Sequence, residues 1–220
     1  MNKEFQKRVF SSIILITIAL YFILKGSFFF TFFLSICLLI SLYEWHMMSK
    51  KKSYNILGIF FILISFYSVY LLRNYDSCCA YPETGLTFFL IVTLVCVFTD
   101  VGGYIFGKVF KGPKLTKISP NKTYAGMFGG FFLSIISINF FVIYTFTFFN
   151  LYFTNQLFSF VILISLTSQI GDILISYFKR KSKIKNTGKI IPGHGGLLDR
   201  IDGMMFAFPL SYVLISIEFI

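Results

Sequence analysis

The chemically richest part of the chain runs from Ser176 to Asp202 and reads SYFKRKSKIKNTGKIIPGHGGLLDRID. Six lysines and arginines between residues 179 and 189 create a positive field that suits phosphate groups. The glycines of residues 192–196 allow backbone N–H groups to approach an anion closely. Asp199 and Asp202 would share one face of a helix that starts here, where two carboxylates can hold one hard cation. This combination predicts a site for a polyphosphate with Mg²⁺.

Two further carboxylates, Asp100 and Asp172, interrupt apolar stretches of the chain. On helices, both would lie about 10–12 Å inside the boundary of a membrane. A carboxylate in hydrocarbon costs a few kcal/mol or more, so each needs a partner. Small and polar neighbours would allow hydrogen bonds between packed helices, but two carboxylates at equal depth can also share a cation, and we favour a site. Glu44 precedes Trp45 and the lysines of residues 50–52, which predicts an interfacial anchor.

A second basic segment, residues 108–123, leads into a long apolar block. Ser119, Lys122 and Thr123 stand at its end, where a helix entrance rich in hydroxyl groups could seat a phosphate. An ordinary basic loop beside a membrane fits the same residues equally well. The segment does not match GxxxxGK[ST], so a P-loop ATPase is excluded.

Long apolar blocks must position these residues. The chain has 220 residues, of which 56% are hydrophobic and 13% charged, whereas about a quarter of the residues in a soluble domain are charged. Residues 127–149 carry no charge and are long enough to cross a bilayer core of about 30 Å. Seven such blocks occur, at about 9–24, 28–45, 54–72, 86–106, 127–149, 157–178 and 203–220. We therefore predict an all-α, polytopic membrane helix bundle of about seven transmembrane helices.

The net charge of +11 sets the orientation of this bundle. With a cytoplasmic N-terminus, all of the 20 basic residues except Lys25 and Arg73 lie on the inner side. The excess thus reflects orientation and anionic lipid, and nucleic acid is not a predicted partner. We expect one integral membrane unit, with N-terminal transmembrane helices in residues 1–95 and a catalytic part in residues 96–220.

The ordered motifs resemble those of the phosphatidate cytidylyltransferases, or CDP-diacylglycerol synthases. The resemblance covers about residues 95–205, with weaker support from Glu44 and Trp45. The family signature S-x-x-K-R, K-D-x-G and P-G-H-G-G-x-x-D-R-x-D is matched by Ser176, Lys179, Arg180, Lys185, Gly188, Pro192 to Gly196, Asp199, Arg200 and Asp202. Upstream, Thr99-Asp100, Ser119 to Thr123 and Ser168 to Asp172 resemble its aspartate–glycine, S-P-x-K-T and S-Q-x-G-D motifs.

The resemblance implies transfer of a cytidylyl group from CTP to phosphatidate, which gives CDP-diacylglycerol and pyrophosphate in phospholipid biosynthesis. It implies a bacterial plasma (inner) membrane location, a site that faces the cytoplasm, contact with membrane lipid and, as often in the family, a homodimer. The expected catalytic residues are Asp172, Lys179, Arg180, Lys185, Asp199, Arg200 and Asp202, of which Asp172, Asp199 and Asp202 would hold Mg²⁺, with K⁺ as a candidate second cation. The expected substrate-binding residues are Ser119, Lys122, Thr123, Ser176, Gly193, His194, Gly195 and Gly196.

Two positions depart from the family pattern. Asn186 replaces an aspartate and can offer only a carbonyl oxygen to a cation, and Ala125 stands where a glutamate is common. An inactive scaffold, a CTP-dependent kinase of polyprenol-type lipids, and a transporter that uses the buried aspartates remain alternatives. No inverted repeat supports the transporter.

Overall fold

The computed structural model describes most of the chain and is almost entirely helical. The described residues are 14, 16–50, 52–75, 84–116, 119, 122–149, 154–191 and 195–220. Within them, extended backbone pairs only at two isolated bridges, Lys114 with Thr123 and Ile191 with Gly195. The all-α prediction is therefore confirmed.

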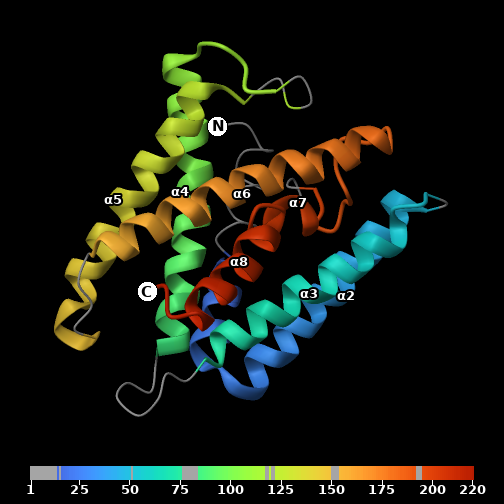
Figure 1. Cartoon of the computed structure of the whole chain (residues 1–220). Helices are drawn as coiled ribbons and strands as arrows, with labels where there is room; N and C mark the ends of the chain where they lie inside the picture. The colour runs from blue at the N-terminus through green and yellow to red at the C-terminus, as the bar shows by residue number, and fades with distance from the viewer. Residues whose placement is uncertain are drawn as a thin grey trace. The chain divides into compact units, whose positions relative to one another are not determined.

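Seven labelled helices follow one another along the chain (Figure 1). They are α2 (Ser27–Ser49), α3 (Asn55–Arg73), α4 (Thr84–Phe110), α5 (Tyr124–Phe149), α6 (Asn155–Lys181), α7 (Leu198–Ile201) and α8 (Met204–Ser216). In the described part of the chain, α2 to α6 are long and apolar enough to cross a membrane, whereas Ile16–Lys25 and α8 are shorter apolar helices. The protein is thus a multi-pass membrane protein, and a total of seven crossings stays a prediction.

The chain folds into two compact units. Unit 1 comprises Met1–Tyr70 and Phe178–Ile201, and unit 2 comprises Leu71–Tyr177 and Asp202–Ile220. The last turn of α6 therefore belongs to unit 1 together with α2, most of α3 and α7. The remainder of α6 belongs to unit 2 together with α4, α5 and α8. The expected boundary near residue 95, which separates the motif-rich part of the sequence, stays a prediction.

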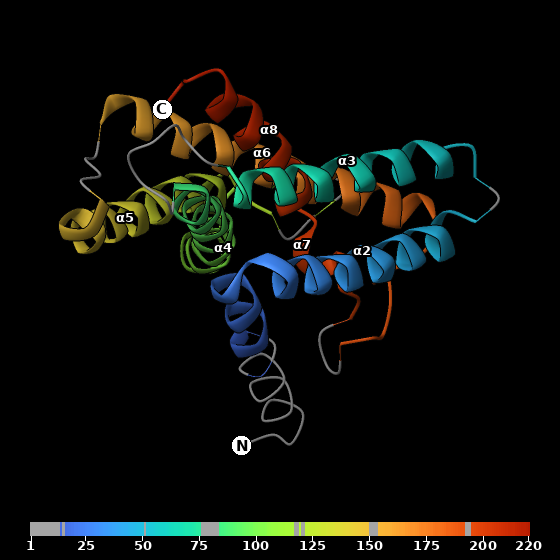
Figure 2. The same cartoon turned by 90° about the horizontal axis from the view of Figure 1, so that it is seen from below.

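In unit 1, an aromatic cluster gathers the ends of three helices. The buried Trp45 indole of α2 donates a hydrogen bond to the carbonyl oxygen of Asn55, the first residue of α3, over 3.1 Å. The Trp45 ring also meets Tyr54 and Phe178 edge-on, at centroid distances of 6.1 and 5.5 Å. Figure 2 shows α2 and α3 as two long helices joined at one end. The cluster anchors the start of the basic segment, because Phe178 directly precedes Lys179.

In unit 2, glycines allow α4 and α5 to touch backbone to backbone. A Cβ added to Gly102 of α4 would lie 2.3 Å from the Gly129 carbonyl oxygen, and one added to Gly126 of α5 would lie 2.7 Å from the Gly103 carbonyl oxygen. Only residues without a side chain permit this approach. The contact places the N-terminal end of α5 beside the part of α4 that carries Asp100.

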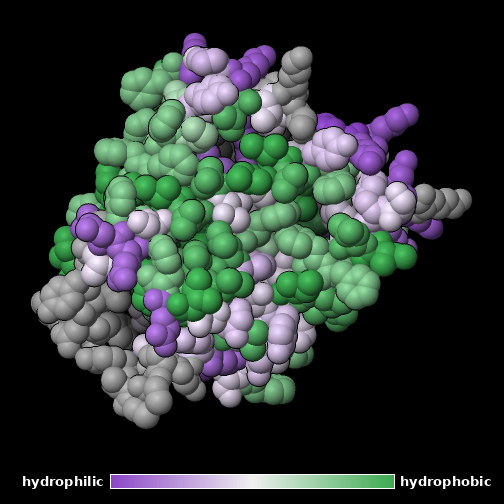
Figure 3. Space-filling model, viewed as in Figure 1, coloured by the Kyte–Doolittle hydropathy of each residue, from purple (hydrophilic) through white to green (hydrophobic). Residues whose placement is uncertain are grey.

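Large apolar side chains cover the outer surfaces of the long helices. Phe28 on α2, Leu57 on α3 and Phe140 on α5 are 74%, 71% and 69% exposed. Figure 3 shows many hydrophobic residues at the surface, with hydrophilic residues among them and at the edges. Apolar surface of this extent suits contact with lipid hydrocarbon and would be unusual in contact with water.

Candidate functional site

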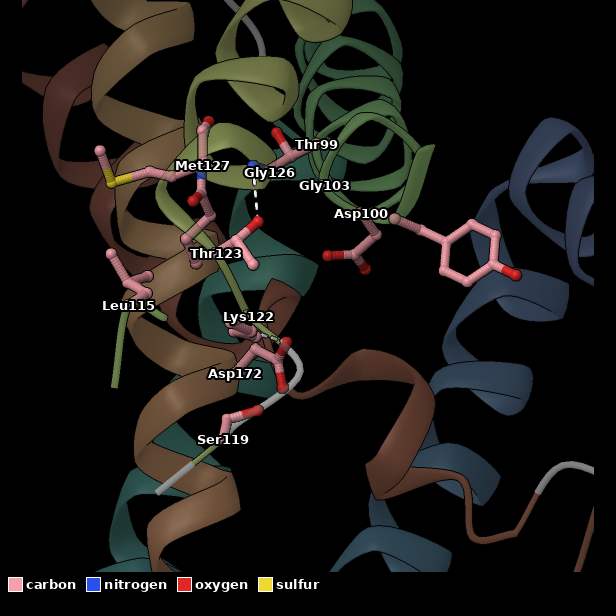
Figure 4. A pocket seen from close by; sticks show the side chains of 12 residues that line it. Thr99, Asp100, Gly103, Leu115, Ser119, Lys122, Thr123, Gly126, Met127 and Asp172 are labelled. Carbon is pink, nitrogen blue, oxygen red and sulfur yellow. Dashed lines mark hydrogen bonds and ion pairs between the residues drawn. The ribbon is translucent and has the colours of Figure 1, made fainter. Parts of the chain in front are cut away.

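A cavity of about 300 Å³ lies in unit 2, where α4, α6 and the start of α5 meet. Asp100 of α4, Lys122 before α5 and Asp172 of α6 line it (Figure 4). Three segments that are far apart in sequence thus contribute charged side chains to one open cavity. The remaining lining residues are Thr99, Gly103, Tyr104, Leu115, Ser119, Thr123, Gly126, Met127 and Gln169.

The backbone around Lys122 is held in place on both sides. The Leu115 N–H donates to the Lys122 carbonyl oxygen over 2.8 Å, which folds the basic loop back on itself. Thr123 then caps α5, because its hydroxyl oxygen accepts a hydrogen bond of 3.1 Å from the Gly126 N–H. The cap fixes the backbone that leads from Lys122 into α5, and the predicted substrate-binding role of Thr123 stays a prediction.

Lys122 forms an ion pair with Asp172 inside the cavity. Both side chains are about one quarter exposed, so the pair is shielded yet reachable. The Asp100 carboxylate extends from α4 into the same space (Figure 4), and the Ser176 hydroxyl lies 3.5 Å from Asp172 Oδ1. One ammonium and two carboxylates on one cavity can bind an anionic group together with a cation.

The signature segment in unit 1 is organised around Asp199. Its Oδ1 accepts a hydrogen bond of 3.0 Å from the Lys179 ammonium, and its Oδ2 accepts bonds of 2.9 and 3.1 Å from the Thr187 and Gly196 N–H groups. Burial by itself would raise the pKa of Asp199, but these three donors stabilise the charged form. The net effect holds the pKa of Asp199 below its usual value, so this carboxylate is ionised at neutral pH.

Glu44 corrects the sequence prediction, because it is no interfacial anchor. It is 1% exposed, and its carboxylate accepts hydrogen bonds from the Thr187 hydroxyl and from the Leu197 and Leu198 N–H groups, at 3.0, 3.0 and 2.8 Å. The prediction was wrong because the neighbouring tryptophan and lysines suggested a membrane surface, whereas the partners of Glu44 lie more than 140 residues along the chain.

The glycine-rich turn of the signature closes between Ile191 and Gly195. Two backbone hydrogen bonds of 2.9 and 3.2 Å join these residues, and Gly195 has a φ of 94°, which strongly favours glycine. The predicted ligands Gly193 and His194 lie outside the described residues.

The other basic residues of the signature lie at the surface of unit 1. Arg180 and Lys185 are exposed, and Arg180 donates to the Ile184 carbonyl oxygen over 3.1 Å at the end of α6. Arg200, on α7, is exposed as well. Lys179 differs from them, because it is buried against Asp199. Three of the four predicted basic residues can thus reach a soluble anion.

Asp202 lies beyond α7, which ends at Ile201. It is buried, and its Oδ1 accepts a hydrogen bond of 3.0 Å from the Gly203 N–H. Asp172 and Asp202 belong to unit 2 and Asp199 to unit 1. The expected magnesium centre of Asp172, Asp199 and Asp202 therefore stays a prediction.

The described residues contain no group of three or more His, Cys, Asp or Glu side chains arranged to hold a metal ion. Protein-bound Mg²⁺ commonly uses one or two carboxylates together with substrate phosphates and water. The cavity carboxylates Asp100 and Asp172 fit that type of site. Asp199 fits less well, since among its described partners three donors already occupy its oxygens.

Sequence reasoning missed some of the cavity residues. Tyr104 and Met127 line the cavity but lie in apolar runs that give no chemical signal. Gln169 has a signal, because it belongs to the S-Q-x-G-D motif. Its amide donates a hydrogen bond of 3.4 Å to the Met127 carbonyl oxygen and so links α6 to α5.

Comparison with known proteins gives consistent matches. A family model described as "Cytidylyltransferase family" matches residues 6–80 and 57–218. A phosphatidate cytidylyltransferase of Rickettsia typhi is 35% identical over 213 residues, which cover 93% of this chain and 89% of that protein. Proteins of the same name from Staphylococcus aureus and Staphylococcus epidermidis are 42% and 40% identical over 132 residues. In both, the match covers 60% of this chain and about half of the relative.

Proposed function

Because this chain belongs to the cytidylyltransferase family, we propose that it is a phosphatidate cytidylyltransferase. It transfers a cytidylyl group from CTP to phosphatidate and releases pyrophosphate. The relatives from Rickettsia typhi and Staphylococcus aureus both carry this name.

One observation carries the proposal. Three segments that resemble separate family motifs contribute Asp100, Lys122 and Asp172 to a single cavity. A lysine and two carboxylates are the groups that a phosphate and its counter-cation require. These residues come from α4, α6 and the start of α5, helices with the length and composition of membrane spans. A lipid phosphate could therefore reach them from the membrane surface.

The reaction requires positioning of two anions. A phosphatidate phosphate oxygen attacks the α-phosphorus of CTP in line, and the bond to the pyrophosphate oxygen breaks. Lys122 exchanges its ion pair with Asp172 for a phosphate oxygen and lowers the repulsion between the two substrates. The Thr123 cap keeps Lys122 in place during this exchange. No protein nucleophile is needed for this transfer.

Asp172 is the carboxylate that we propose to hold Mg²⁺, together with Asp100 and substrate oxygens. Asp199 and Asp202 stay predicted ligands, and K⁺ stays a predicted second cation. When bound, Mg²⁺ neutralises charge on phosphate oxygens. Ser119, which lines the cavity, and Ser176, whose hydroxyl lies 3.5 Å from Asp172 Oδ1, are proposed to donate hydrogen bonds to the same anions.

The basic surface of unit 1 is proposed to bind the nucleotide phosphates. Arg180, Lys185 and Arg200 carry exposed positive charge that suits phosphate groups. Gly195 and Gly196 stay predicted binding residues, and their N–H groups donate to the Ile191 carbonyl oxygen and to Asp199. Gly193 and His194 complete the proposed binding segment. Buried Lys179 acts on this segment through Asp199.

We place the protein in the inner membrane of a bacterium, with the site toward the cytoplasm. The distribution of lysine and arginine supports this orientation, because the segments with most of the basic residues fall on one side. CTP is a cytoplasmic solute, and phosphatidate presents its phosphate at the membrane boundary. A homodimer stays a prediction from the family resemblance.

Purified protein in detergent tests the proposal when it is supplied with Mg²⁺, CTP labelled at either the α- or the γ-phosphate, and either phosphatidate or, in a parallel sample, a polyprenol-type lipid alcohol. The α-label should enter the lipid product and the γ-label should appear in pyrophosphate. Entry of the γ-label into a lipid alcohol would instead identify a kinase. No transfer of either label would contradict the proposed function.

A further inference from the structure

The buried carboxylate of Glu44 has a function that its position in the sequence does not suggest. It lies near the end of α2, yet the residues that donate hydrogen bonds to it, Thr187, Leu197 and Leu198, belong to the signature segment. We infer that Glu44 is a positioning residue, which orders the segment from Thr187 to Leu198 so that its glycine-rich turn can receive phosphate. This inference rests on the proposed function for its effect on activity.

The charge of Glu44 is compensated by hydrogen bonds. Within the described chain, the two ion pairs are Lys122 with Asp172 and Lys179 with Asp199, and neither involves Glu44. A buried carboxylate costs much free energy unless donors surround it. One hydroxyl and two backbone N–H groups meet this need. The segment supplies these donors only in its folded conformation, so the hydrogen bonds to Glu44 stabilise that conformation.

Two glycines of the signature pack directly on this carboxylate. A Cβ on Gly188 would lie 2.5 Å from Glu44 Oε1, and a Cβ on Gly196 would lie 2.5 Å from Oε2. No larger residue fits at either position without displacing Glu44. The family glycines at these positions therefore have a second purpose, because they make room for the carboxylate of α2.

Glu44 and Asp199 hold the same segment from two directions. Thr187 donates its hydroxyl to Glu44 and its N–H to Asp199. Near the other end, the Gly196 N–H reaches Asp199, and the next N–H, that of Leu197, reaches Glu44. Both ends of the segment that contains the glycine-rich turn are thereby fixed. The segment is a loop closed by two carboxylates, and loss of either should release it.

The test compares Glu44→Gln with Ser41→Ala in the full-length protein. The amide of glutamine keeps the volume but presents an NH₂ group to one of the donors. Ser41 is a matched control, because it is equally buried on α2 and its hydroxyl donates to the Cys37 carbonyl oxygen of its own helix. Hydrogen exchange of the peptide that spans residues 186–199 is measured with the kcat and KM for CTP.

In Glu44→Gln, we expect the amide hydrogens of this peptide to exchange about tenfold faster or more, because local opening of the segment then breaks fewer hydrogen bonds. The value of kcat should fall between about 10-fold and 100-fold, because reacting groups are misplaced. Ser41→Ala should leave both the exchange rate of this peptide and the value of kcat unchanged. Wild-type exchange in Glu44→Gln, or equal acceleration in Ser41→Ala, would overturn the inference.

A second variant keeps the inference testable if Glu44→Gln does not fold. Thr187→Val removes one donor and retains the carboxylate, so the same peptide should exchange faster by a smaller factor. Unchanged exchange would contradict the inference. The exchange measurement needs no substrate, so a wild-type protein that transfers no label would disprove the proposed function and leave this result standing.

Discussion

At the scale of single residues, the protein compensates the charges of its buried and half-buried carboxylates in different ways. Asp172 and Asp199 each form an ion pair with a lysine, whereas the donors that Glu44 meets among the described residues are a hydroxyl group and backbone N–H groups. An ion pair with Lys122 can open when a phosphate arrives, because the ammonium gains a new anion. A carboxylate bound by backbone N–H groups has no such exchange partner. The first arrangement suits binding, and the second suits permanent order.

The lowered pKa of Asp199 predicts how stability depends on pH. The carboxyl group has a pKa of about 3.9 in an unfolded chain and a lower one in the folded protein. Its stabilising contribution is therefore fully present above about pH 4 and is lost as the pH falls through the folded pKa. Asp199→Asn lacks this contribution. We expect its melting temperature to lie below that of the wild type at pH 7, with a difference that narrows below pH 4.

Thermal unfolding in detergent between pH 7 and pH 2.5 measures this difference. Glu218→Gln is the control, because Glu218 is an exposed carboxyl group near the C-terminus. A gap between Asp199→Asn and the wild type that stays constant over the whole range would show that Asp199 does not stabilise the fold through its charge.

At the scale of helices, the contact between α4 and α5 positions the cavity. Two neighbouring glycines of α4 differ in how closely they approach α5. A Cβ added to Gly102 would lie 2.3 Å from the Gly129 carbonyl oxygen, whereas one added to Gly103 would lie 3.7 Å from the Gly126 carbonyl oxygen. We expect Gly102→Ala to reduce the free energy of unfolding by about 2 kcal/mol or more. Gly103→Ala should change it far less. Denaturation in detergent measures both, and equal destabilisation would contradict the close backbone contact.

Hydropathy predicts the helices but not their ends. The apolar block at residues 86–106 becomes α4, which continues to Phe110, and the block at 127–149 becomes α5, which begins at Tyr124. Apolar residues mark the part that avoids water, whereas hydrogen bonds set the ends, as the Thr123 cap does for α5. The basic residue of the cavity, Lys122, lies in such a polar end.

At the scale of the whole molecule, the sequence predicts which segments contribute to the candidate site. It predicts less well which side chains contact one another. The order of basic and acidic residues along the chain indicates the signature segment and the basic segment of residues 108–123 that leads to the cavity. The partnership of Glu44 with Leu198 spans 154 residues, and no local pattern reveals it. The division of α6 between two units is equally invisible, because its apolar pattern continues without a break across Tyr177 and Phe178.

The central claim is that the cavity of unit 2 performs cytidylyl transfer, and the kcat of Asp172→Asn tests it most directly. Purified variant and wild type are compared in the formation of CDP-diacylglycerol from CTP and phosphatidate, with Glu218→Gln as the control. We predict that Asp172→Asn lowers kcat by about 100-fold or more, because the substitution removes a charge that faces the reacting phosphates. The control should match the wild type. Turnover near the wild-type value in a folded Asp172→Asn protein would contradict the account.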